Sequence, residues 1–265
     1  MIGSPRVLLN VYRETWRINI LTTLEYRANF IAWLVFALFY HGTSLITLWV
    51  LLHAFPSMNG WSFKEMAFLY ALWMTIHAIH STFFSGVDSV PEEVREGSFD
   101  RVLLRPLDAL FQAIATPGQV FPDDLILGFV TLGVASWYVG LTFTWWTLPV
   151  MALVLFGGAL IELAVSLLLA TASFWVVKVD AARWIVLQLE QEFTRYPISI
   201  YSRGVRFVLT FMVPFAFMNY YPAAAFLGKG PVYLALLSPL VGAIALTAAY
   251  AFWRVGLNKY SGVGH

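Results

Sequence analysis

The stretch LPVMALVLFGGALIELAVSLLLATASFWVV, residues 148–177, is long and apolar enough to decide the class of the fold. A helix needs about 20 mostly apolar residues to cross the hydrocarbon core of a bilayer. The only charged side chain in this stretch is that of Glu162, near its middle. A charge at that depth is costly and usually has a function or a partner. The stretch therefore predicts a membrane-spanning helix with one polar site near its centre.

The composition of the whole chain agrees with a membrane protein. Of the 265 residues, 60% are hydrophobic and 12% are charged, and the mean hydropathy is +0.73. An average soluble domain carries about 25% charged residues. The chain has no cysteine, which excludes disulfides and thiolate metal sites. We expect an all-α polytopic membrane protein.

Six segments are long and apolar enough, or nearly so, to span a membrane. They are residues 29–54, 65–86, 124–146, 148–177, 205–227 and 231–256. His77 and His80 interrupt the second segment, and Pro214 and Pro222 should bend or break the fifth. Because the sequence contains no internal repeat, we expect one transmembrane domain over residues 1–265.

The basic residues predict the orientation of these spans. Of the 16 Lys and Arg residues, all but Lys64 and Lys229 fall on one side of the six-span arrangement. The positive-inside rule makes that side cytoplasmic, so both termini are expected in the cytoplasm. Residues 1–27 place Tyr12 and Trp16 on one helical face and Arg13 on another, which is typical of an interfacial helix. Residues 180–203 have a similar pattern and are a candidate for a second interfacial helix.

A charged segment, residues 88–113, interrupts the apolar sequence between the second and third spans. Its core, VPEEVREGSFDRVLLRPLDALF at 90–111, mixes both signs of charge with apolar side chains, as a surface half buried on a partner does. Ser89 is suited to start a helix, Gly97 to end it, and Pro106 to stop a second short helix that begins after Ser98. The segment predicts a stiff cytosolic hairpin, although an ordinary solvated loop is an alternative.

Within this segment, residues 96–106 read EGSFDRVLLRP. They resemble the signature E-G-x-[LF]-D-x-x-L-L-R-P of a bacterial family of ABC-2-type permeases, the membrane subunits of ATP-driven exporters. Further similar pieces are LEYRANF at 24–30, YPISIY at 196–201, PFAFMNYYPA at 214–223 and GLNKYSG at 256–262. The resemblance therefore covers the chain from end to end.

The resemblance implies a fold like that of ABC-2-type (type V) exporters: six transmembrane helices, an N-terminal elbow helix over residues 1–27 and a cytosolic coupling helix in residues 88–113. In such permeases the coupling helix docks on a separate nucleotide-binding subunit. The residues implied at or beside that contact are Glu96, Gly97, Asp100, Arg101, Leu104, Arg105 and Pro106. The location implied is the inner membrane of a bacterial cell.

The source of energy is expected to be another chain. The phosphate-binding motif G-x-x-x-x-G-K-[ST] does not occur, and Gly228-Lys229-Gly230 lacks its spacing and hydroxyl. We therefore expect no cofactor on this chain, and ATP and Mg²⁺ on a partner ATPase subunit. The implied partners are a dimer of ABC ATPase subunits and a second permease subunit, either identical or related. No nucleic acid is expected.

The fourth and fifth expected spans also offer candidate residues for a substrate pathway. The candidate residues for it are Glu162, Phe211, Phe215, Tyr220 and Tyr221. The scarcity of charge in the spans favours an amphiphilic or hydrophobic substrate, and the resemblance implies its export from the cytoplasm or the inner leaflet. Glu162 could equally be a neutral, hydrogen-bonded core carboxyl, and the aromatic residues could serve packing alone.

Two other functions compete with an exporter. An intramembrane enzyme would need paired catalytic groups, and Glu162 with His77 and His80 is the set that the spans offer. A passive channel is less consistent with the high aromatic content and the lack of a charged ring. His77 and His80 share a helical face, but two histidines without a third ligand do not predict a metal site.

Overall fold

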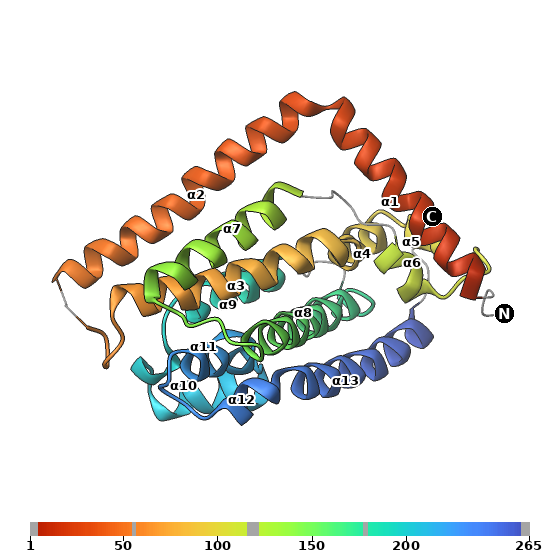
Figure 1. Ribbon diagram of the computed structural model, residues 1–265. Helices are drawn as coiled ribbons and strands as arrows, with labels where there is room; N and C mark the ends of the chain where they lie inside the picture. The colour runs from red at the N-terminus through yellow and green to blue at the C-terminus, as the bar shows by residue number, and fades with distance from the viewer. Residues whose placement is uncertain (1–4, 55–56, 116–121, 177–179, 261–265) are drawn as a thin grey trace.

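The computed structural model describes residues 5–54, 57–115, 122–176 and 180–260 (Figure 1). These residues are almost entirely helical, and their one β-type contact is an isolated bridge between Met58 and Trp61. The all-α prediction is confirmed. The longer helices are α1 (Pro5–Glu25), α2 (Arg27–Ala54), α3 (Phe63–Phe83), α4 (Gly86–Arg95), α7 (Pro122–Val139), α8 (Thr147–Ala172), α9 (Asp180–Thr194) and α13 (Ser238–Lys259). The short ones are α5 (Phe99–Leu103), α6 (Ala109–Ala115), η1 (Ile198–Ile200), α10 (Arg203–Phe207), η2 (Val208–Met212), η3 (Ala216–Tyr220), α11 (Tyr221–Phe226) and α12 (Val232–Leu236).

The molecule is an elongated bundle with two distinct ends (Figure 1). The short helices α4, α5 and α6 gather at one end, close to the end of α13, and residues 86–115 define this hairpin end. The helices α10, α11 and α12 gather at the opposite end together with the loop before α3. Residues 57–62 and 198–231 define this distal end.

Three helical segments are long and apolar enough to cross a membrane: Arg27–Leu51, Thr147–Ala172 and Val232–Lys259. They fall in the first, fourth and sixth expected spans. The second expected span corresponds to α3, which is less apolar because it carries polar groups such as His77, yet is buried along most of its length. The third corresponds to α7, a shorter apolar helix that ends at Val139.

The expected fifth span, residues 205–227, is not one crossing helix. Two arms, Arg203–Met212 and Ala216–Phe226, are bent by 82° around Pro214, so the break predicted there is confirmed, whereas Pro222 lies within the second arm and does not interrupt it. Before the bend, the Ser199 carbonyl accepts a hydrogen bond from Asn59 Nδ2 at 3.0 Å. After it, Lys229 Nζ donates to the Gly60 carbonyl at 2.6 Å. Because both ends of the segment contact neighbouring residues, the segment enters and leaves at the distal end.

The passage between the two ends is made by α9 instead. The Phe174 ring, just before α9, lies 5.4 Å from the Phe99 ring at the hairpin end. Ser199, just after α9, lies against Asn59 at the distal end. The prediction of an interfacial helix over 180–203 was therefore wrong, because the buried face of α9 packs inside the bundle. Arg203 and Arg206, which were expected on the same side as the hairpin, therefore lie at the distal end. The arginines of the hairpin lie at the hairpin end, as expected.

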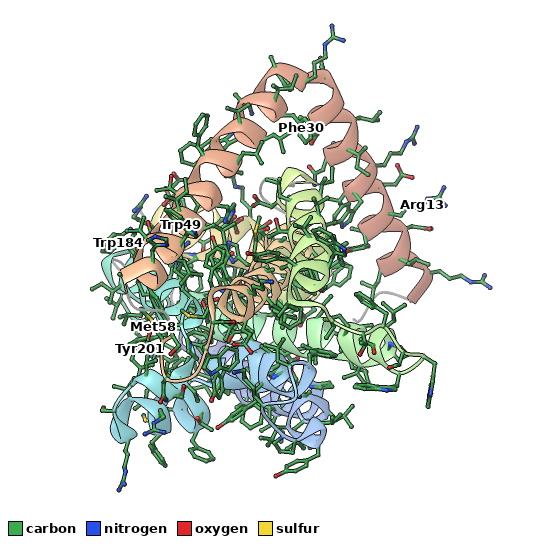
Figure 2. All side chains as sticks on the ribbon, turned by 60° about the vertical axis from the view of Figure 1, so that its left-hand side comes forward. Arg13, Phe30, Trp49, Met58, Trp184 and Tyr201 are labelled. Atoms are coloured by element: carbon green, nitrogen blue, oxygen red, sulfur yellow. The ribbon has the colours of Figure 1, made fainter. Side chains whose placement is uncertain are left out.

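The first helix lies apart from the bundle over much of its length (Figure 1). Trp16 packs on Phe83 at the end of α3, with ring centroids 5.1 Å apart. Arg13 points away from the bundle on the other face (Figure 2). The helix bends into α2 at Tyr26. The proposed interfacial role of this helix remains a prediction.

The closest packing joins α8 to α13 through glycines. A methyl group on Gly242 would lie 2.6 Å from the Gly157 carbonyl oxygen and 2.8 Å from Leu160 Cβ. Small residues at helix crossings allow such close approach in membranes. The two helices therefore run in contact at a separation that only glycine permits.

The path of residues 199–229 can be tested by labelling, because the chain contains no cysteine. Single cysteines at Arg203 and Lys229 are expected to react with a membrane-impermeant maleimide from the same side of intact cells. A cysteine at Arg101, at the hairpin end, is expected to react only after the cells are opened. Reaction of positions 203 and 229 from opposite sides would contradict the path described here.

The glycine contact predicts a specific loss of stability. Gly242→Ala is expected to cost about 1–3 kcal/mol because the added methyl group overpacks the crossing of α8 and α13. Gly133→Ala in α7 is the matched control, since no heavy atom lies within 4 Å of a methyl group there. Thermal unfolding in detergent should show a lower Tm for Gly242→Ala only; equal shifts would be inconsistent with the close crossing.

Candidate functional site: the charged hairpin and the buried polar cluster

The charged segment forms a stiff hairpin of short helices at one end of the bundle. Gly97 has a positive φ of 71°, which ends α4 and reverses the chain as predicted. The second short helix, α5, follows Ser98 and ends before Pro106, also as predicted. The first helix of the hairpin, α4, begins earlier than expected, at Gly86, so Ser89 lies inside α4 rather than at its start.

The hairpin is fixed to the bundle by Phe99. This side chain is fully buried. Its ring centroid lies 5.4 Å from that of Phe174 after α8, 6.2 Å from that of Trp253 in α13 and 5.4 Å from that of Tyr260. Burial of a phenylalanine side chain contributes about 1.5–3 kcal/mol. The Phe99 ring therefore joins α5 to the residues at the ends of α8 and α13.

Most of the residues implied in partner contact face outward from this anchored hairpin. The exposed ones are Glu96, Arg101, Leu104, Arg105 and Pro106, whereas Gly97 and Asp100 are half-buried. Leu104, which lies between Arg101 and Arg105, is 84% exposed, an unusual degree for a leucine. The outward face thus combines an apolar side chain with guanidinium groups.

The Asp100 side chain contacts the bundle instead of the outward face of the hairpin. Its Oδ1 accepts a hydrogen bond from the Tyr260 hydroxyl at 2.9 Å, which ties α5 to the end of α13. Burial, and then this hydrogen bond, raise the pKa of Tyr260 to about 12. Asp100 therefore positions the hairpin, and its carboxylate is not simply offered to a partner.

A pocket of about 190 Å³ lies within the hairpin and carries both signs of charge. It is lined by Glu93, Ser98, Phe99, Arg101, Val102, Arg105, Gln112 and Ala113. Burial raises the pKa of the Glu93 carboxyl, and the guanidinium groups of Arg105 and Arg101 oppose this shift. Gln112 Nε2 donates to the Val102 and Leu107 carbonyls, which closes the hairpin internally.

A second group of polar side chains lies in the middle of the bundle. His77 Nδ1 on α3 is 2.5 Å from Glu162 Oε1 on α8. Glu190 on α9 joins them, and one ligand atom from each of the three residues lies within 4.8 Å of the others. His80 belongs to a separate contact, with Ser166 Oγ and Asp88 Oδ2 each 3.2 Å from its Nε2. A buried charge such as that of Glu162 was expected to have a partner. In the structure this partner is His77, which lies one helical turn from His80.

Glu190 was not predicted as a site residue, because residues 180–203 were a candidate for an interfacial helix. The spacing did contain an indication: Glu190 shares a helical face with Val186 and Phe193, both packed on the core. A carboxyl group on the apolar face of a helix points inward, where it needs a partner. Trp73 Nε1 supplies one, at 3.3 Å from Glu190 Oε1.

The other candidate pathway residues lie in the bent segment at the distal end. Phe211 is 71% exposed, whereas Phe215 is buried. Tyr220 packs on Trp61 with ring centroids 5.5 Å apart, and Tyr221 packs on Phe217 at 4.8 Å. Glu162 instead contacts His77 in the centre, so the structure does not gather the five candidates into one site.

The apolar helices and the polar groups buried among them define a polytopic all-α membrane protein. The family described as ABC-2 family transporter protein matches residues 38–264, and the chain belongs to that family. It is therefore a membrane permease subunit of an ABC transporter rather than an enzyme, and such permeases associate with an ABC ATPase subunit. No curated protein and no solved structure matches the chain.

The hydrogen bond between Tyr260 and Asp100 predicts a pH-dependent contribution to stability. Tyr260→Phe is expected to lower the stability by about 1 kcal/mol at neutral pH. Because the folded-state pKa is about 12, above the usual value of about 10, the contribution is complete below pH 10 and is lost as the pH rises through 12. The Tm difference between the wild type and Tyr260→Phe, measured against pH, should shrink over this range.

Tyr233→Phe is the control for this measurement, because Tyr233 is 63% exposed at the distal end. Its Tm should stay close to that of the wild type at neutral pH. A Tyr260→Phe variant as stable as the wild type would show that the contact is absent.

Proposed function

We propose that the chain is the permease subunit of an ABC exporter and that its hairpin is the coupling element driven by a separate ATPase chain. The observation that carries the proposal is the two-sided construction of residues 99–105, that is, α5 and the two residues that follow it. Phe99 is locked between α8, α13 and Tyr260 on the inner side. Leu104 and Arg105 are exposed on the outer side.

This construction is suited to transmitting force. A partner that grips Leu104 and Arg105 and moves toward the bundle displaces α5 as a rigid unit. Phe99 and Asp100 then transfer the displacement to the end of α13 and to Phe174 after α8. Rigid displacement of packed elements is a known form of switching transition, whereas a flexible loop would absorb the motion.

The outward face also supplies the chemistry of a specific contact. A leucine beside arginines combines an apolar anchor with charges that set orientation and register on a partner. In the proposed complex, ATP and Mg²⁺ are bound by the ATPase subunits. A dimer of these subunits requires two hairpins, so the transport unit contains two permease chains, either identical or related.

The remaining parts of the proposal follow from composition and resemblance. The hairpin end carries Arg95, Arg101 and Arg105 and faces the cytoplasm of a bacterial cell by the positive-inside rule, with both termini on that side. The chain lies in the inner membrane. The substrate is amphiphilic or hydrophobic and leaves the cytoplasm or the inner leaflet, since charge is scarce within the spans.

The proposal is tested by removing the outward side chains. Leu104→Ala and Arg105→Glu are each expected to lower the recovery of an ABC ATPase with the purified permease about tenfold, as loss of an interface anchor does. The tagged chain is purified from its own host in mild detergent, and the ATPase is quantified by mass spectrometry. Arg13→Glu is the matched control, because it makes the same charge change at an exposed site on α1.

The variants must remain folded in the membrane for this comparison. Their exposed positions make this the expected result, and size-exclusion chromatography of the detergent-solubilised protein verifies it. Unchanged recovery of the ATPase with both variants would refute the coupling role of the hairpin.

A further inference from the structure

We propose that His77, Glu162 and Glu190 bind one divalent transition-metal ion of the Zn²⁺ class in the centre of the bundle. The three residues come from α3, α8 and α9, and one ligand atom from each lies within 4.8 Å of the others. One imidazole nitrogen and two carboxylate oxygens form a ligand set that Zn²⁺ accepts, with room for a fourth ligand. This proposal holds whichever direction the transporter moves its substrate.

The charges of the cluster favour a divalent cation. In the form that binds a metal, with His77 neutral and both carboxyl groups ionised, the cluster would carry two negative charges in a region where Glu162 is 2% and Glu190 is 3% exposed. Isolated charges of this kind are not tolerated in a low-dielectric interior; they are paired or they coordinate metals. One divalent ion balances both carboxylates at once.

Glu162 provides a second, independent observation. Its Oε1 contacts His77, but its Oε2 is buried and has no hydrogen-bond partner among the described residues. A buried carboxylate oxygen without a partner carries the full cost of its desolvation. A metal ion bound by this carboxylate removes that cost.

The surroundings meet two further requirements of a metal site. Trp73 Nε1 donates to Glu190 Oε1 at 3.3 Å and so orients this carboxylate from outside the cluster, as second-layer hydrogen bonds do at metal centres. The His77 side chain is 40% exposed, whereas both carboxylates are covered. The imidazole therefore marks the open side through which an ion enters.

His80 is not assigned to the site. Its Nε2 is engaged by Ser166 and Asp88, on the side of the hairpin end. The bound ion would link α3, α8 and α9, the last being the helix that sequence analysis had placed on the surface. Binding of the ion replaces the hydrogen bond between His77 and Glu162 and releases its proton.

The proposal is tested by metal binding to the purified full chain, without a histidine tag. The protein is treated with a chelator, dialysed against Zn²⁺ or Co²⁺, and analysed by elemental mass spectrometry. The Co²⁺ form is also examined by visible absorption, which reports its ligand geometry. We expect one ion per chain, proton release on binding and weaker binding at lower pH, because protons compete for all three ligands.

The variants His77→Ala, Glu162→Gln and Glu190→Gln should each weaken binding by about tenfold or more. His53→Ala and Glu14→Gln are the controls, since they remove the same groups at exposed positions outside the cluster, and they should bind as the wild type does. Wild-type protein that binds no ion overturns the proposal, whether or not the variants fold. Binding that survives all three cluster substitutions overturns it as well.

Discussion

The structure depends on one interaction: polar side chains that face one another across the bundle pair between its helices. The helix α3 passes through the centre with His77 and His80, and lipid cannot satisfy either imidazole. Glu162 on α8 meets the first at 2.5 Å, and Ser166 on the same helix meets the second. This pairing fixes the rotation of α8 against α3. It also explains why α9, although less apolar than α2, α3, α7, α8 and α13, packs one face on the bundle, where Glu190 accepts a hydrogen bond from Trp73.

Side-chain contacts also hold the hairpin end in place. Aromatic rings hold the hairpin, and one hydrogen bond sets its register against α13. Phe99, Phe174, Trp253 and Tyr260 form one cluster, so the C-terminal end of the described chain and the charged segment constitute a single mechanical unit. The residues that look alike in the sequence as a charged run therefore divide into two sets, one facing the cluster and one facing the surrounding medium.

Much of this was accessible from the sequence. Apolar length identified α2, α8 and α13, and Gly97 and Pro106 located the turns of the hairpin, because these effects are local. The passage through α9 was not accessible, since its hydropathy is low and its burial depends on contacts with α3 and α8. The segment around Pro214 was predicted to cross the membrane and does not. It is apolar enough to cross, but the contacts of Asn59 and Lys229 hold both of its ends at the distal end. Long-range polar contacts, which apolar patterns do not encode, decided both cases.

One side chain, that of Lys229, holds the bent segment against the distal loop before α3. Lys229 lies over the Trp61 ring at 5.4 Å, pairs with Glu65 at 3.0 Å and donates to the Gly60 carbonyl. One ammonium group thus secures the returning segment to the start of α3. Separation of the returning segment from the start of α3 would therefore break all three contacts of this ammonium group at once.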